Sequence, residues 1–398
     1  MQEQRTHSQI LLAIAILAPG SFHAAPHLAW RTADIRGGLL IGTVDRLVGT
    51  EQGVFAFDAQ LGAVHFVSAG GDSFALLEVE GEAPGLAYGV SDVDVTPSAD
   101  RLALIQSVPP ARAWTRSPIV PAYSSVNRFD APFVDGAFMV GVSLRATEQG
   151  LVTHHTFQMR DDLRLQYGRL SFYDHDDSST VIFEKSSSGA HALVGASSWV
   201  FDASADGTVY LNDVYDVPIL RAFRSDASVL FETLLETTTV RKSAEVIAGN
   251  KASYEKLSEI SPTLVPDVIE TYREIIGIGT RGRPGTVCAV TAAGIGRGKE
   301  SVESVSWWVL DGRTGAVLSK ERVSLPSGRW RVSRVTWFGD RVYLLVTDPT
   351  GDGGFEILAL DLAILRHASS GLESRDHPRS HHGVGARFGN GNGGGGSG

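Results

Sequence analysis

Two aspartates, Asp92 and Asp94, stand two positions apart in the run VSDVDV at 90–95. Because side chains alternate between the two faces of a strand, both carboxylates are expected on one face. Carboxylates that converge can hold a divalent cation or carry out acid–base chemistry. Asp213, in LNDV, could face the same place. No histidine matches this set, however, and aspartates in strands of this kind are commonly turn or edge residues.

The remaining acidic and histidine clusters are less suited to a shared site. His154 and His155 are adjacent in LVTHHTFQ, so in a strand they point to opposite faces and cannot both bind one ion as neighbours. The run Asp174-His175-Asp176-Asp177 falls in a hairpin turn, where it could hold calcium or simply face solvent. The sequence therefore assigns no metal ligand.

Nucleophile and phosphate motifs are also missing from the sequence. No GxSxG elbow occurs, and the glycine-rich runs at 277–285 and 293–300 lack the Walker spacing, so we expect loops there. Cys288 is the only cysteine and lies in the apolar run TVCAV, which favours a buried structural thiol and excludes an internal disulfide. We assign no catalytic residue, no binding residue and no resident cofactor; calcium is considered only if the carboxylates converge.

Short runs with a two-residue period make up most of the chain and predict an all-β fold. A hairpin phrase, an apolar run followed by a polar turn and a second strand, recurs at 54–67, 170–184, 220–232 and 306–326. We expect each phrase to be the outer hairpin of a repeating sheet. Hairpins of a β-sandwich or β-barrel would show the same sequence pattern.

One stretch predicts a complete repeat. Residues 202–232 read as four antiparallel strands, which is one blade of a β-propeller. Residues 334–362 repeat the order but supply three strands, so the fourth is expected from the N-terminal run GGLLIGTV at 37–44. Such closure would remove exposed sheet edges.

Two insertions interrupt the repeats. Residues 238–262 place Ile247, Tyr254 and Leu257 at near-helical spacing, which predicts a helical insertion serving as a packing element or a lid. Residues 107–136 are proline-rich and carry three aromatic side chains, as binding loops and anchored loops both do. The aromatic residues are Trp114, Tyr123 and Phe129.

The ends of the chain differ from the body. Residues 1–25 resemble a secretory signal peptide, with Arg5 before a short apolar block, and predict export to the periplasm or outside the cell. Residues 30–366 are expected to form the propeller. Residues 367–398 are low-complexity and predict a disordered tail, in which His377, His381 and His382 could bind a metal weakly.

The chain of 398 residues carries a formal net charge of −10, which argues against a nucleic-acid partner. No run approaches the ~18 apolar residues of a transmembrane helix. We expect a monomer with no nucleic-acid partner and no membrane span.

Several phrases resemble bacterial six-bladed β-propeller proteins related to the NHL-repeat group. They are EGEAPG (80–85), VSDVDVTPSADRLALI (90–105), the blade at 204–223, and the runs at 304–326 and 339–362. The resemblance covers about residues 35–365, and residues 107–160 depart from it. It implies a six-bladed, all-β propeller of four-stranded antiparallel blades and an exported protein of unassigned function; it identifies no reaction.

Two functions remain open from the sequence. The first is a non-catalytic scaffold that binds a protein, peptide or glycan on one face of the disc. The alternative is a metal-dependent hydrolase or lyase, lactonase-like, acting at the mouth of the central channel. Convergence of the inward carboxylates decides between them.

Overall fold

The computed structural model describes most of the chain between His27 and Asp361. The described residues are 27–32, 44–72, 74–79, 89–106, 113–116, 123–127, 134–162, 165–175, 178–187, 199–237, 241–260, 268, 270–271, 273–295, 302–325, 331–347 and 355–361. The expected signal peptide, the tail with its three histidines, and Phe129, Asp176 and Asp177 lie outside this part of the chain.

The described strands form six four-stranded antiparallel sheets, each a meander of neighbouring strands. The first sheet holds β2 (Val44–Thr50), β3 (Gly53–Asp58), β4 (Ala63–Ser68) and β5 (Phe74–Glu78). The second holds β6 (Val90–Val95), β7 (Leu102–Gln106), β8 (Ala113–Arg116) and β9 (Tyr123–Asn127). The third holds β10 (Ala137–Ala146), β11 (Gly150–Met159), β12 (Gln166–Asp174) and β13 (Ser179–Ser187).

The second half of the chain repeats the arrangement. The fourth sheet holds β14 (Val200–Ala203), β15 (Val209–Asn212), β16 (Ile219–Phe223) and β17 (Val229–Leu234). The fifth holds β18 (Ile275–Gly279), β19 (Thr286–Ile295), β20 (Val302–Asp311) and β21 (Val317–Ser324). The last holds β22 (Arg331–Phe338), β23 (Arg341–Thr347), β24 (Phe355–Asp361) and the N-terminal β1 (His27–Arg31).

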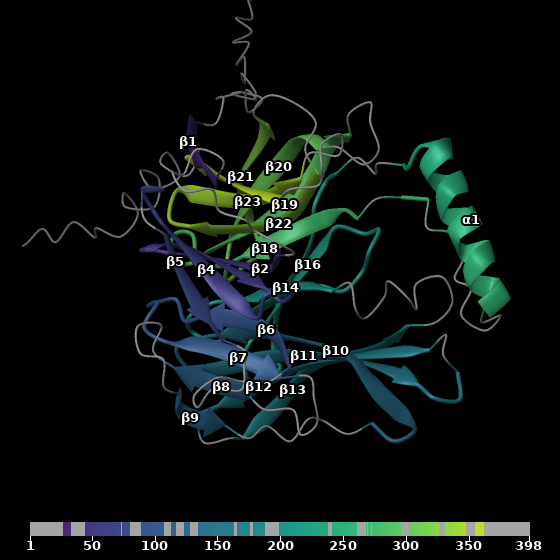
Figure 1. Cartoon of the computed structure of the whole chain (residues 1–398), viewed down its shortest axis with the longest axis horizontal. Helices are drawn as coiled ribbons and strands as arrows, with labels where there is room; N and C mark the ends of the chain where they lie inside the picture. The colour runs from purple at the N-terminus through teal and green to yellow at the C-terminus, as the bar shows by residue number, and fades with distance from the viewer. Residues whose placement is uncertain are drawn as a thin grey trace, which may run out of the picture.

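The sheets are arranged in a closed ring. The first strand of each sheet contacts the first strand of the next, in the order β2, β6, β10, β14, β18, β22 and back to β2. Figure 1 shows β2, β6, β14 and β18 near the middle of the molecule and β5 and β9 near the outside. This arrangement is a β-propeller, and the expectation of an all-β propeller of four-stranded antiparallel sheets is confirmed.

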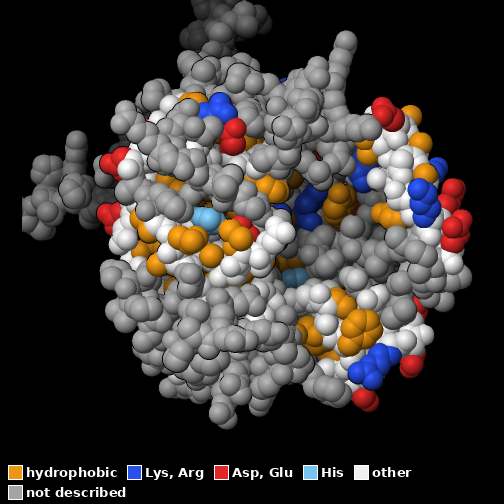
Figure 2. Space-filling model, viewed as in Figure 1, with side chains coloured by type: hydrophobic (Ala, Val, Ile, Leu, Met, Phe, Trp, Pro, Cys, Tyr) orange, Lys and Arg blue, Asp and Glu red, His pale blue; other side chains and the backbone are white. Residues whose placement is uncertain are grey.

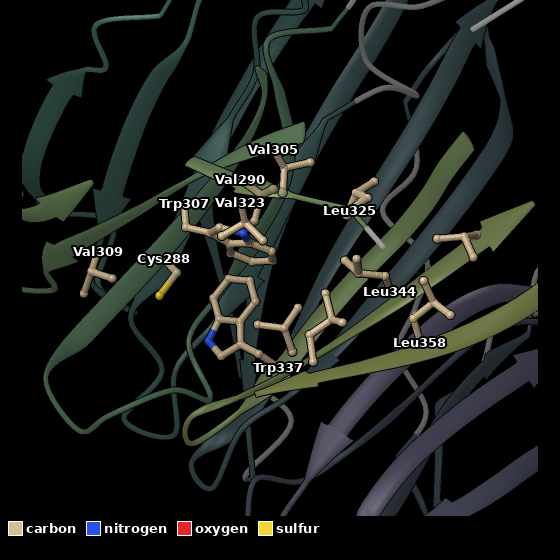
Figure 3. Packing of buried hydrophobic residues seen from close by; sticks show 13 residues of the cluster. Cys288, Val290, Val305, Trp307, Val309, Val323, Leu325, Trp337, Leu344 and Leu358 are labelled. Carbon is tan, nitrogen blue, oxygen red and sulfur yellow. The ribbon is translucent and has the colours of Figure 1, made fainter. Parts of the chain in front are cut away.

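Apolar clusters fill the space between successive sheets. The cluster between the fifth and last sheets packs Trp307 edge-on against Trp337, with ring centroids 6.3 Å apart (Figure 3). Gly279 of β18 is required here, because a Cβ would lie 2.5 Å from the Trp337 ring. The run at 277–285, expected to be a loop, therefore begins inside an inner strand.

Cys288 belongs to the same cluster and is buried, as expected. Burial raises the pKa of its thiol to about 12, so the thiolate is not formed at neutral pH. The side chain packs as a small apolar group.

The ring closes through the N-terminus, as expected, but through a different segment. β1 pairs with β24, whereas the run at 37–44 was expected to do so. Residues 37–43 lie outside the described part of the chain, and Val44 already begins β2. The run HLAWR carries no obvious alternation, but Trp30 is buried and packs against Tyr343.

Two further expectations need correction. The phrase at 54–67 forms β3 and β4, the middle hairpin of its sheet, while the other three phrases are outer hairpins as predicted. Residues 107–136 are not simply an insertion, because they contain β8 and β9. The position of a hairpin within its sheet cannot be inferred from its sequence, because middle and outer hairpins show the same alternation of apolar and polar residues.

The predicted helical insertion is confirmed as α1 (Ala244–Ile260). It lies between β17 and β18 and stands beside the sheets in Figure 1. Its side chains that the structure describes are exposed or partly buried. No helix in the described part of the chain is long and apolar enough to cross a bilayer.

Candidate functional site

The inner strands are joined to one another by side-chain acceptors. Asp92 and Asp94 of β6 accept hydrogen bonds from the backbone N–H groups of Leu144 and Ala146 of β10, both at 2.8 Å. The prediction that these aspartates share one face of an inner strand is therefore confirmed. That face looks toward the next inner strand rather than into an open ligand set.

A hydrogen bond from one inner strand to a side-chain acceptor on its neighbour recurs at every second contact between inner strands. Asp202 of β14 accepts bonds from the N–H and hydroxyl of Thr280, which follows β18, at 2.9 and 3.0 Å. The hydroxyl oxygen of Thr336 on β22 accepts a bond from the N–H of Gly49 on β2 at 3.0 Å. Every second inner strand thus supplies an acceptor, and the strand that follows supplies the donor.

Arginines on the donor strands neutralise these carboxylates. The Arg281 guanidinium lies 3.0 and 3.1 Å from the two oxygens of Asp94. Arg145 lies 3.5 Å from Asp92 and 3.4 Å from Asp202.

Arg46 is placed more loosely. It lies 3.8 Å from Asp94 and 3.9 Å from Asp202, and its buried Nε has no hydrogen-bond partner. The centre of the ring is therefore a network of three carboxylates and three guanidiniums.

Burial governs the titration of this network. It raises the pKa of Asp92, although Arg46 and Arg145 oppose the effect. Burial and the nearby Arg46 lower the pKa of Arg145 to about 10, which keeps its charge at neutral pH. A cation entering the centre would have to displace fixed guanidiniums from these oxygens.

The structure places the other predicted residues away from the channel. Asp213 follows β15 and is paired with Lys185 at 2.8 Å and with Arg221. Asp174 accepts bonds from the N–H and hydroxyl of Ser178, as a turn residue does. The ring of His175 lies 3.0 Å from the carbonyl oxygen of Glu148.

His154 and His155 are buried in β11 with different surroundings, as their alternation predicts. The ring of His154 stacks on Trp199 with centroids 4.6 Å apart, while Nδ1 of His155 is 3.3 Å from the Thr153 hydroxyl. Burial lowers the pKa of His154 to about 3 and that of His155 to about 4. Among the described residues, no group of three or more His, Cys, Asp or Glu side chains could hold a metal ion.

A cavity of about 400 Å³ opens at the mouth of the channel, where all six inner strands contribute. We call it the channel mouth. Its lining residues are Asp45, Arg46, Ser91, Asp92, Val142, Ser143, Arg145, Trp199, Val200, Phe201, Arg273, Gly277, Ile278, Arg334 and Val335. In Figure 2, a hollow near the middle of the visible face has Lys or Arg and hydrophobic side chains at its edge.

The channel mouth lies on the face where the inner strands begin. Connections from an outer strand to the next inner strand also lie on this face, so the insertion that carries α1 leaves the disc there. A second cavity, of about 510 Å³, is lined by turns of the opposite face, including Ala205 and Arg313. Arg281 lines this second cavity and Asp92 lines the channel mouth, so the central network lies between the two cavities.

Sequence reasoning missed the arginines. Arg46, Arg145 and Arg281 lie in runs that otherwise read as ordinary strand and turn, far from Asp92 and Asp94 along the chain. Each is a single arginine in or just after an inner strand. The sequence cannot pair these arginines with the aspartates, because the pairing depends on the order of the sheets in the ring.

No family model and no curated protein matches the chain, so the NHL-type resemblance stays an expectation. Among solved structures, a luciferin-regenerating enzyme is 14% identical, with a TM-score of 0.44 over 81% of this chain and 94% of that one. A gluconolactonase from Xanthomonas campestris is 12% identical, with a TM-score of 0.43 over 85% and 96%. An acylaminoacyl peptidase from Pyrococcus horikoshii is 11% identical, with a TM-score of 0.39 over 78% and 50%.

The class of protein follows from the chain's own sheets: it is a β-propeller with a charged network across its channel. Similarities this distant carry no activity over to this chain.

Proposed function

We propose that this protein is a non-catalytic β-propeller scaffold that binds a protein, peptide or glycan on one face of its disc, through the channel mouth. One observation carries the proposal. The inward carboxylates are already bonded to backbone N–H groups and guanidiniums, while a cavity lined by every inner strand stays open on the same axis. Rigid scaffolds commonly recognise ligands at such concave sites.

Asp92 favours a second candidate, a metal-dependent hydrolase or lyase at the channel mouth. Its carboxyl lines the cavity, and burial raises its pKa, as is common for carboxyl groups at catalytic sites. This candidate needs further metal ligands beside Asp92, and the neighbouring carboxylates are held by arginines.

Thermal melting with calcium and with zinc separates the two candidates. A ligand that binds only the folded state raises the melting midpoint. We expect no rise with either ion. A rise that Asp92→Asn abolishes, together with hydrolysis of a lactone substrate, would establish the alternative.

A positive test uses peptide and glycan arrays probed with the labelled protein. Ser143→Trp fills the channel mouth and should abolish binding, whereas Ala205→Trp on the opposite face should not. Melting curves of both variants report whether each is folded; Ser91→Leu replaces Ser143→Trp if that variant is not. Binding that survives a folded, blocked channel mouth would overturn the proposal.

We further propose that the protein is exported and works as a monomer. The apolar block within residues 1–25 supports export. Cell fractionation of strains expressing the chain with and without these residues tests export, and light scattering of the purified protein tests the monomer.

A further inference from the structure

Arg273 is a cation at the channel mouth that no described carboxylate neutralises. Its Nε donates to the carbonyl oxygen of Ile275 at 2.8 Å, one terminal nitrogen lies 3.4 Å from the amide oxygen of Asn212, and the guanidinium lies 5.5 Å from the Tyr215 ring. None of the ion pairs within the described residues involves it. Burial lowers its pKa to about 10, so it keeps its charge at neutral pH.

The other guanidiniums of the channel have acidic neighbours. Arg281 pairs with Asp94, Arg145 with Asp92 and Asp202, and Arg334 lies near Asp45, to whose carbonyl oxygen it donates at 2.8 Å. The cavity lining contains four arginines against two aspartates.

Glu274, the residue after Arg273, does not line the cavity, and its carboxylate accepts a hydrogen bond from the Thr237 hydroxyl at 2.9 Å.

A positively charged, partly desolvated cavity favours an anionic ligand, because the attraction between opposite charges is stronger there than in water.

The rest of the lining defines the body of the ligand. Val142, Ile278 and Val335 offer apolar surface, and Ser91 and Ser143 offer hydroxyl groups. A volume of about 400 Å³ is at the small end of ligand pockets, so the cavity holds a compact group, either a small molecule or the end of a longer chain.

We propose that Arg273 binds the carboxylate of a small organic acid, or of a chain end that presents the same group, with the apolar part of the ligand against Val335 and Ile278. This proposal rests on the binding function proposed above and names its ligand class. A guanidinium can donate two parallel hydrogen bonds to a carboxylate, which gives orientation as well as affinity.

Calorimetry on the full chain tests the proposal with hexanoate, benzoate and N-acetyl-leucine as probes. Hexanamide, N-acetyl-leucine amide and inorganic phosphate are the comparison ligands. We expect the acids to bind and their amides to bind at least about tenfold more weakly, as the loss of a charged hydrogen-bonded pair implies. Stronger binding of N-acetyl-leucine than of hexanoate would identify a chain end as the source of the carboxylate.

Variants assign the interaction to Arg273. Arg273→Gln should weaken acid binding at least about tenfold and leave amide binding unchanged, and Arg273→Lys should restore part of the affinity. Arg313→Gln, a matched change on the opposite face, should leave binding unaltered. Equal binding of acids and amides, binding of phosphate alone, no binding of any acid, or acid binding that survives Arg273→Gln would each overturn the proposal.

The two proposals fail differently. Array binding that is blocked by Ser143→Trp but indifferent to a carboxylate would leave the scaffold function intact and remove the ligand class. Acid binding through Arg273 together with metal-dependent turnover would keep the ligand class and remove the non-catalytic function.

Discussion

At the scale of single residues, the channel separates two kinds of arginine. Arg145 is enclosed between Asp92 and Asp202 and also lies 4.3 Å from the Phe201 ring centroid. Arg273 has aromatic and amide neighbours but no acidic partner among the described residues. The first arrangement suits a structural role, and the second suits a ligand.

We predict that Arg145→Gln destabilises the fold more than Arg273→Gln. Removing Arg145 takes the nearer guanidinium from two buried carboxylates, Asp92 and Asp202, and breaking a buried pair costs about 3–5 kcal/mol. Removing Arg273 gives up a cation–π contact and a charged hydrogen bond to the Ile275 carbonyl oxygen, worth about 1.5–3 kcal/mol, and leaves no described carboxylate buried without a cation. Urea unfolding of both variants measures the difference, and equal losses would contradict this division of roles.

At the scale of elements, β1 fastens the last sheet. It pairs with β24, Trp30 donates to the carbonyl oxygen of Ala69 in the neighbouring sheet at 2.9 Å, and the Thr32 hydroxyl oxygen accepts from the N–H of Ile357 at 3.0 Å. Arg31 also pairs with Glu356 at 2.6 Å. One short strand therefore joins the two ends of the propeller.

We predict that a chain lacking residues 1–32 loses at least about 3 kcal/mol of stability, the usual cost of removing a buried tryptophan, and aggregates through the exposed edge of β24. A chain lacking only residues 1–26 keeps β1 and is the matched control. Urea unfolding and light scattering compare the two truncations. Similar stability in both would show that the ring does not depend on this strand.

At the scale of the whole molecule, stability should fall as the pH drops from about 6.5 toward 4. His154 and His155 have folded-state pKa values of about 3 and 4, below the usual 6.5, so the unfolded chain takes up protons that the folded chain refuses. At pH 4.5 each histidine then costs about 2–3 kcal/mol. Burial also lowers the pKa of His65, which acts in the same direction, whereas the raised pKa of Asp92 acts against it.

His154→Phe keeps an aromatic ring against Trp199 and removes one titrating group. Unfolding free energies measured between pH 7 and 4.5 should therefore fall less steeply for this variant than for the parent chain. An unchanged slope would show that His154 is not kept neutral by the fold.

The sequence by itself determined the period-two strands, the four-stranded repeat at 202–232 and the helical insertion, because these depend on neighbouring residues along the chain. It also indicated that Asp92 and Asp94 share a face, since alternation within one strand fixes this.

The tertiary structure alone decided which segment closes the ring and what the aspartates meet. Arg145 and Arg281 reach Asp92 and Asp94 only because the ring places β10 beside β6 and brings the end of β18 to the same centre. Contacts between residues so far apart in sequence are set by the order and twist of packed sheets. That order joins Asp92 and Asp94 to arginines in a neutralised network, and it leaves Arg273 at the mouth without an acidic partner among the described residues.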